Sequence, residues 1–143
     1  MTPPDAPLPR LEDLAEGQSV REEVAVTEEL LQAFVALSGD RAHAHTDAAH
    51  ARAMGFPDRI AHGLLVGLPY SRLLGMRLPG GNTVIQKLQL DMLAPVGVGD
   101  TLLYSVVVER ILPSVKAVVL SLSATNAHGE MVSRGSATCV FRP

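Results

Sequence analysis

The sequence predicts an α+β fold in which a curled antiparallel sheet wraps around one central apolar helix. Residues 61–74 are apolar on almost every side of a helix, which is typical of a helix buried all round. After Gly80-Gly81-Asn82 the apolar residues instead recur at every second position, as they do in strands. A helix that apolar is buried only if the sheet curls around it, so the two patterns together place the helix in the sheet's concave face.

The first part of the chain predicts a tail followed by one domain. Residues 1–18 hold four of the ten prolines, and we expect a flexible N-terminal tail there. The remaining residues, 19–143, have the length of a single domain with its own core. That domain begins with a short strand over 19–26.

Two short helices are predicted before the central one. Thr27 is a suitable N-cap for the first helix, which ends at Gly39. Asp47 is a suitable N-cap for the second helix, which ends at Gly55. The segment between them, 40–46, is therefore expected to be a loop held at both ends.

The central helix contains Pro69, which lacks the N–H that a regular helix interior requires. We expect either a bend there or a helix whose first turn is 66–69. A strand follows over 84–92, whose predicted covered face holds Val84, Gln86, Leu88, Leu90 and Met92. Three further strands form an antiparallel meander and are predicted at about 102–111, 116–126 and 131–141.

The composition excludes several functional classes. The formal net charge is -3 and aromatic residues make up only 3% of the chain, whereas nucleic-acid binders have a basic face interleaved with aromatic residues. The apolar runs all stop short of the roughly 18 residues that a membrane span needs, so we expect a soluble, cytoplasmic protein. The single cysteine, Cys139, cannot form an internal disulfide and is expected to be buried in a strand.

The segment between the two short helices collects groups that can transfer protons. It holds Asp40, His43 and His45 within six residues. A carboxylate and an imidazole five residues apart in a bent loop can act on one substrate as acid and base. The same residue types are ordinary zinc ligands, but their spacing matches no familiar metal motif, so we expect no metal.

The start of the central helix offers a second chemical feature. Backbone N–H groups at a helix N-terminus stabilise negative charge on a nearby oxygen. Gly63 supplies such an amide and lets a substrate approach closely, because it has no side chain. We expect His62, which precedes it, to cap or brace this helix start.

Four segments between Phe34 and the C-terminus carry a family resemblance: FVALSGDRAHAHTD, IAHGLL, YSRLLG and LAPVGVGDTL. They resemble the MaoC-like dehydratases and R-specific enoyl-CoA hydratases of the hotdog superfamily. The resemblance implies a single hotdog fold with Asp40 and His45 as the catalytic residues. It also implies an oxyanion-hole amide at Gly63 and an active-site serine at Ser71.

The chain departs from the family pattern between the two implied catalytic residues. Where the family usually has Asn-Pro, this sequence has Ala42-His43. The change removes a polar side chain and a rigid turn residue, which affects the shape of the loop and the choice of substrate. His43 and His62 remain candidates for contact with the substrate.

The resemblance implies a hydratase or dehydratase that acts on the 2,3 double bond of an enoyl thioester. The corresponding (R)-3-hydroxyacyl group is carried by coenzyme A or by an acyl carrier. One of Asp40 and His45 removes a proton from water and the other, with His45 favoured, protonates the α-carbon, without a cofactor. The resemblance also implies a homodimer or higher homo-oligomer in which two sheets join edge to edge.

Two other functions remain open at this point. The first is a hotdog acyl thioesterase, which uses a carboxylate to direct water at the thioester carbonyl carbon. The second is a noncatalytic subunit that binds an acyl chain or completes a partner's active site.

Overall fold

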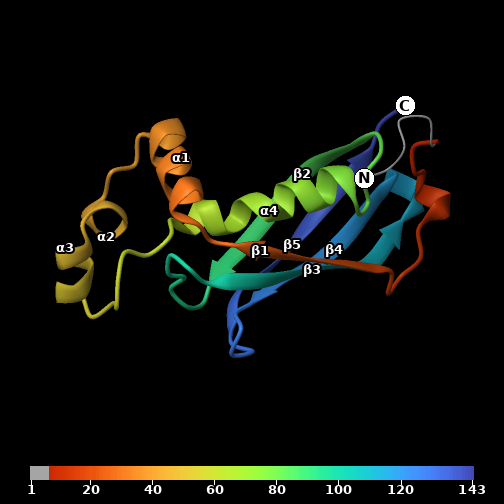
Figure 1. Cartoon of the computed structure of the whole chain (residues 1–143). Coiled ribbons are helices and arrows are strands. Elements are labelled where there is room, and N and C mark those ends of the chain that lie inside the picture. The colour runs from red at the N-terminus through yellow and green to blue at the C-terminus, as the bar shows by residue number, and fades with distance from the viewer. Residues whose placement is uncertain (1–6) are drawn as a thin grey trace.

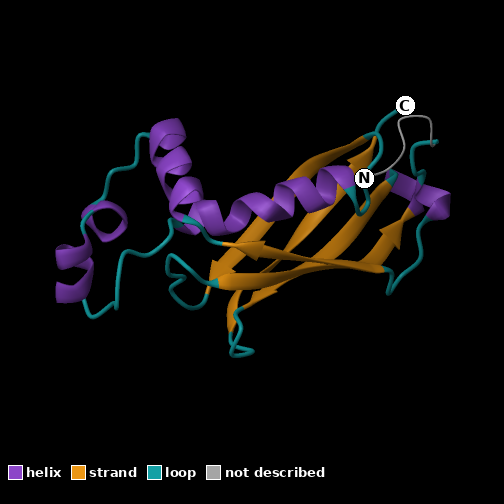
Figure 2. Ribbon diagram, viewed as in Figure 1, coloured by secondary structure: helices purple, strands orange, loops and turns teal. Residues whose placement is uncertain are grey.

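Helix α4 (Gly63–Met76) lies across the concave face of a five-stranded antiparallel sheet (Figures 1 and 2). The computed structural model of the chain describes residues 7–143. The strands follow the order β1-β3-β4-β5-β2 across the sheet, which confirms the predicted α+β architecture. The strands are β1 (Ser19–Ala25), β2 (Thr83–Met92), β3 (Thr101–Leu112), β4 (Ala117–Thr125) and β5 (Met131–Phe141).

Three helices precede α4 and form an arm, residues 28–60, that extends beyond one end of the sheet (Figure 1). They are α1 (Glu28–Ser38), α2 (His43–Thr46) and α3 (Ala48–Ala53). Two 3-10 turns complete the described elements, at Leu11–Asp13 and Pro113–Val115. None of the helices within residues 7–143 is long and apolar enough to cross a membrane.

Part of the predicted tail contacts the domain. Its first six residues lie outside the described part of the chain. In the rest of the segment, Leu11 and Leu14 pack against the hydrophobic core. The backbone N–H of Gly17 also donates to the carbonyl of Val108, at 2.8 Å. These contacts tie the described part of the segment to β3.

The ends of α1 and α3 follow the predicted caps. The Thr27 hydroxyl oxygen accepts a hydrogen bond from the N–H of Leu30 at 3.2 Å, and Gly39 ends α1 with a left-handed φ of 74°. The Asp47 carboxylate accepts from the N–H of His50 at 3.0 Å at the start of α3. Both helices are therefore fixed by the local sequence.

The segment predicted as a loop between these helices contains one helical turn, α2, which corrects that prediction. The N–H of His45 donates to the carbonyl of Ala42 at 2.9 Å. The Thr46 hydroxyl donates back toward the carbonyls of Arg41 and Ala42. Alanine has a high helix propensity, whereas the Asn-Pro of the family pattern favours a turn. The two alanines around His43 therefore favour this turn.

Helix α4 begins at Gly63, so the alternative start at residue 66 is wrong. The N–H of Val66 donates to the carbonyl of His62 at 3.1 Å, and Pro69 lies inside the helix. The proline costs about 3 kcal/mol in a helix interior. Tyr70 and Leu73, both fully buried, offset this cost, because burial of one large apolar side chain stabilises by about 1.5–3 kcal/mol.

The C-terminal strands form the predicted meander, with β4 between β3 and β5. Buried and partly exposed residues alternate along β3 and β4, so one face of the sheet covers the core. Cys139 on β5 is buried as predicted, and burial raises the pKa of its thiol to about 11.

The prediction of which face of β2 is covered is wrong for the first part of the strand. A bulge between Ile85 and Lys87 shifts its register against β5. Ile85 pairs with buried Cys139 and packs against the core, while Val84 is 53% exposed. The extra residue at the bulge places each side chain before it on the opposite face of the sheet from the predicted one. The predicted alternation therefore holds only after the bulge, where Leu90 packs on the core.

Candidate active site

The predicted carboxylate and imidazole lie together at the base of the arm. Asp40 follows the left-handed Gly39 that ends α1, and His45 lies on α2. An oxygen of the Asp40 carboxylate and ring nitrogens of His45 and His62 all lie within 4.8 Å of one another. The Asp40 carboxylate also accepts a hydrogen bond from the N–H of Ala42 at 3.0 Å, which orients it.

His45 is half-buried and is held through one ring nitrogen. Its Nδ1 lies 2.7 Å from the carbonyl oxygen of Ile60. A carbonyl oxygen only accepts hydrogen bonds, so Nδ1 carries the proton. In the neutral ring, Nε2 therefore has the free lone pair and is the nitrogen able to take a proton.

Ile60 is held in place by an ion pair between the two ends of the arm. Its neighbour Arg59 donates two hydrogen bonds to the carboxylate of Glu28, one of them at 2.9 Å. These hydrogen bonds hold the pKa of Glu28 below its ordinary value, so the pair is charged at neutral pH. Sequence reasoning missed both residues, because a backbone carbonyl has no side-chain signature and Arg59 lies 31 positions from Glu28.

His62 is buried beside the pair, with 2% of its surface exposed. Its Nε2 lies 3.0 Å from the carbonyl oxygen of Asp40, and its ring stacks on His45 with 3.8 Å between centroids. The His62 ring also contacts the ring of Phe34, with 4.6 Å between centroids. Its side chain makes no capping hydrogen bond to α4, so the capping part of the prediction is wrong. The ring instead braces the segment that carries Asp40.

Gly63 and His45 line one cleft of about 320 Å³. The rest of its lining is mostly apolar and comes from the start of α4, the end of β2 and the segment 93–96. As the first residue of α4, Gly63 has a backbone N–H without an acceptor in its own helix. The cleft therefore combines a basic nitrogen with a donor suited to an anionic oxygen.

Ser71 and His43 lie outside this cleft. Ser71 is exposed on α4, about two turns beyond Gly63. His43 is exposed on α2, where its ring packs edge-on against His50 with 5.1 Å between centroids. The structure brings Asp40 and His45 together, but the side chains of Ser71 and His43 do not join them.

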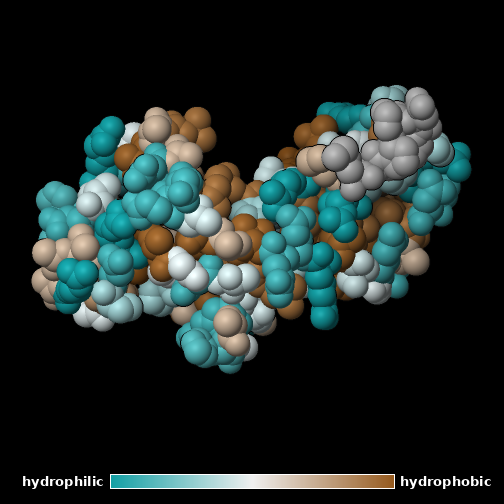
Figure 3. Space-filling model, in the orientation of Figure 1, coloured by the Kyte–Doolittle hydropathy of each residue, from teal (hydrophilic) through white to brown (hydrophobic). Residues whose placement is uncertain are grey.

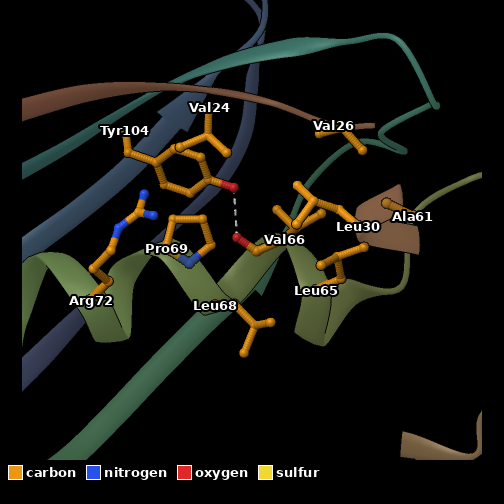
Figure 4. A pocket seen from close by; sticks show the side chains of 10 residues that line it. All are labelled: Val24, Val26, Leu30, Ala61, Leu65, Val66, Leu68, Pro69, Arg72 and Tyr104. Carbon is orange, nitrogen blue, oxygen red and sulfur yellow. Dashed lines mark hydrogen bonds between the residues drawn. The ribbon is translucent and has the colours of Figure 1, made fainter. Parts of the chain in front are cut away.

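A more apolar cavity of about 300 Å³ lies on the opposite flank of α4, against β1 and β3 (Figure 4). Arg72 is its one charged lining residue. Inside it, the buried Tyr104 hydroxyl donates to the carbonyl of Val66 at 2.7 Å, and burial raises the pKa of that hydroxyl. Val66 and Ala61 line both this cavity and the cleft, so they form the wall between the two.

The Asp40, His45 and His62 cluster contains atoms of the kinds that bind zinc. A zinc-bound imidazole nitrogen must be free of a proton. The Nε2 of His62 faces a carbonyl oxygen and so carries a proton, as does the Nδ1 of His45. The hydrogen bonds thus commit one nitrogen of each ring, an arrangement that suits proton transfer by His45.

Comparisons with known proteins identify the family of the chain. The model of the MaoC like domain family matches residues 12–128. The chain is 36% identical over 138 residues to an (R)-specific enoyl-CoA hydratase of Rhodospirillum rubrum, covering 96% of this chain and 95% of the relative.

Solved structures show the same fold. The R-hydratase PhaJ1 from Pseudomonas aeruginosa, in its unliganded form, has a TM-score of 0.87 and 34% identity, covering 94% of this chain and 85% of that one. The (R)-hydratase from A. caviae involved in PHA biosynthesis also has a TM-score of 0.87, with 29% identity, and covers 92% of this chain and 99% of that one. The chain therefore belongs to the MaoC-like dehydratase family and has its single hotdog fold.

Proposed function

We propose that this protein is a hydro-lyase that adds water across the 2,3 double bond of an enoyl thioester to give the (R)-3-hydroxyacyl thioester, and catalyses the reverse dehydration. The 36% identity to an (R)-specific enoyl-CoA hydratase over almost the whole chain supports this reaction. The observation that carries the proposal is the grouping of the Asp40 carboxylate and the His45 ring within 4.8 Å of each other. His45 in turn shares a cleft with the first amide of α4.

In the hydration direction, one water molecule is held between Asp40 and His45. Neutral His45 takes a proton from that water at Nε2 as the oxygen attacks the β-carbon. The Asp40 carboxylate accepts the water's other hydrogen bond and stabilises the imidazolium that forms. The proton on Nε2 is then delivered to the α-carbon, so His45 makes both transfers in this proposal, whereas the sequence-based expectation divided them between Asp40 and His45. The Ile60 carbonyl supports this assignment, because it keeps the Nδ1 proton out of the reaction.

The same step builds negative charge on the thioester carbonyl oxygen. The free N–H of Gly63 lies at the positive end of the α4 dipole and is suited to donate a hydrogen bond to that oxygen. One such preorganised donor contributes about 2.7–4 kcal/mol to transition-state stabilisation. The thioester carbonyl is therefore assigned to the cleft beside Gly63, with the double bond facing His45.

We further propose that the enzyme is a homodimer that uses the free edge of β2. Leu88 and Met92 on this edge strand, after the bulge, are 43% and 44% exposed. On α4, Leu64 and Leu68 are 73% and 47% exposed, and hydrophobic surface over α4 and β2 is visible in Figure 3. An uncovered apolar edge strand promotes pairing with another chain, which favours a second copy here. Sedimentation equilibrium measures the mass directly, and a monomer at micromolar concentration argues against the dimer.

The substrate carrier is proposed to be coenzyme A or an acyl carrier protein, with the enzyme in the cytoplasm. The name of the Rhodospirillum rubrum relative favours the coenzyme A thioester. The single buried cysteine is compatible with a reducing compartment.

Incubation with crotonyl-CoA tests the reaction. Loss of the absorbance of the conjugated thioester measures hydration, and a thiol reagent measures release of free coenzyme A. We expect hydration without thiol release, and a fall in kcat of about 10²–10⁴-fold for Asp40→Asn and for His45→Gln. Thiol release would assign a thioesterase, and tight binding without turnover would assign a noncatalytic subunit.

A further inference from the structure

His62 contacts both members of the proposed catalytic pair from a third segment of the chain. Its Nε2–H donates to the backbone carbonyl of Asp40 at 3.0 Å. Its ring stacks on that of His45 at 3.8 Å with 26° between the planes. It also immediately precedes Gly63. One residue therefore links the backbone of Asp40, the imidazole of His45 and the start of α4.

The stack supplies an orientation that the Ile60 hydrogen bond does not. A single hydrogen bond at Nδ1 restrains the His45 ring at one atom, and small coupled changes of χ1 and χ2 can still tilt the plane of the ring. A second ring stacked against it restrains the plane, and therefore the direction of the Nε2 lone pair. His62 also contacts Phe34, with 4.6 Å between the ring centroids. Because His62 is only 2% exposed, it has no room to tilt.

The hydrogen bond from His62 positions Asp40 in a comparable way. Asp40 follows Gly39, where the chain leaves α1 through a left-handed conformation. The N–H of Asp40 donates to the hydroxyl of Ser38 at 3.1 Å, and its carboxylate accepts from the N–H of Ala42. The bond to the carbonyl comes from 22 positions away and fixes this segment relative to α4. Without it, local contacts alone would hold the carboxylate.

We propose that His62 is a positioning residue that sets the geometry of Asp40 and His45 without touching the reacting atoms. This inference rests on the proposed function of those two residues. It uses only the Nε2–H and the ring faces of His62. The Nδ1 atom is buried and forms no hydrogen bond within residues 7–143. The role therefore needs a planar ring and one donor, but no second nitrogen.

Two variants separate these needs. His62→Gln keeps a donor close to the place of Nε2 but loses the stack, whereas His62→Phe keeps a ring but loses the donor. A misplacement of about 1 Å near a reacting group can cost about 10²-fold in rate. We expect each variant to lower kcat by about 10- to 100-fold with KM changed by less than about 3-fold. His128→Gln, in the exposed turn before β5, is the matched control and should keep wild-type kinetics.

The ring nitrogens give a direct readout that does not depend on turnover. In ¹⁵N NMR of the wild-type protein, His45 should be the Nδ1-protonated tautomer and His62 the Nε2-protonated one. In His62→Gln the His45 signals should shift or broaden, because the ring loses its neighbour. The opposite tautomer of His62 in the wild type overturns the proposal even if neither variant folds.

The kinetic outcomes also distinguish this proposal from the one on which it rests. An unchanged kcat in both variants, or a rise in KM alone, overturns the positioning role, and the rise in KM would indicate direct substrate contact. If the wild type has no hydratase activity, the proposed function fails. A changed His45 spectrum in His62→Gln would then still establish the contact between the two rings.

Discussion

Replacement of Gly63 by proline tests whether the first backbone N–H of α4 contributes to kcat. Proline has no N–H, so the variant removes the proposed donor to the thioester oxygen. The fold should accept the change, because proline is favoured at the first position of a helix. The preceding His62 has φ -60° and ψ 141°, an extended conformation that a following proline permits.

The magnitude follows from the single donor that is lost. Removal of one oxyanion-hole donor lowers kcat by about 10²–10³-fold, which corresponds to about 2.7–4 kcal/mol of transition-state stabilisation. A Cβ at position 63 would lie 3.5 Å from the Met92 side chain, which is an ordinary contact. The added Cβ should therefore not displace β2, and the melting temperature of Gly63→Ala should stay near that of the wild type.

Steady-state hydration of crotonyl-CoA with Gly63→Pro and Gly63→Ala is the assay. The alanine variant adds the Cβ but keeps the N–H, so it should lose less of the wild-type kcat than the proline variant. A proline variant with wild-type kcat would refute the role of the amide. Equal losses in both variants would attribute the effect to the space beside Met92 and not to the donor.

Two further predictions concern stability. Gly135→Ala should destabilise the fold by about 1–3 kcal/mol in urea unfolding, because its Cβ would lie 1.9 Å from the carbonyl oxygen of Gln89 on β2, a backbone atom that cannot move aside. Gly75→Ala, with nothing within 4 Å of its Cβ, is the control and should not destabilise. The lowered pKa of Glu28 in the folded state means that its bond to Arg59 stabilises the fold above the ordinary value of 4.5 and loses this effect as the pH falls below it. The difference in free energy of unfolding between wild type and Glu28→Gln should therefore be largest near neutral pH and should disappear in acid. A difference that is constant with pH would contradict this linkage.

The parts of the fold that the sequence predicted are those determined by short-range chemistry. The cap at Thr27 and the left-handed Gly39 act on residues within one helical turn, so their effect is visible in the sequence itself. The same holds for Asp47 at the start of α3. The apolar residues on all sides of α4 and the alternation along β3 likewise indicate which surfaces are buried.

The parts that the sequence did not predict depend on partners distant in the chain. The bulge in β2 exists only relative to β5, and no residue within β2 marks it. The contact between His62 and Asp40 joins residues 22 positions apart, and the acceptor is a backbone carbonyl. The local pattern thus identified Asp40 and His45 as candidates, but only the folded chain assigned Nε2 of His45 as the free nitrogen.

The ion pair between Glu28 and Arg59 has a consequence for how this family can vary. The arm leaves the domain at one partner and returns at the other, so this ion pair closes a loop of about thirty residues. Lengthening such a loop adds little closure entropy, since the cost grows only with the logarithm of its length. Insertions between α3 and Arg59 should therefore be tolerated without moving the Ile60 carbonyl, which would let the rim of the site diversify while the proton-transfer residues stay fixed.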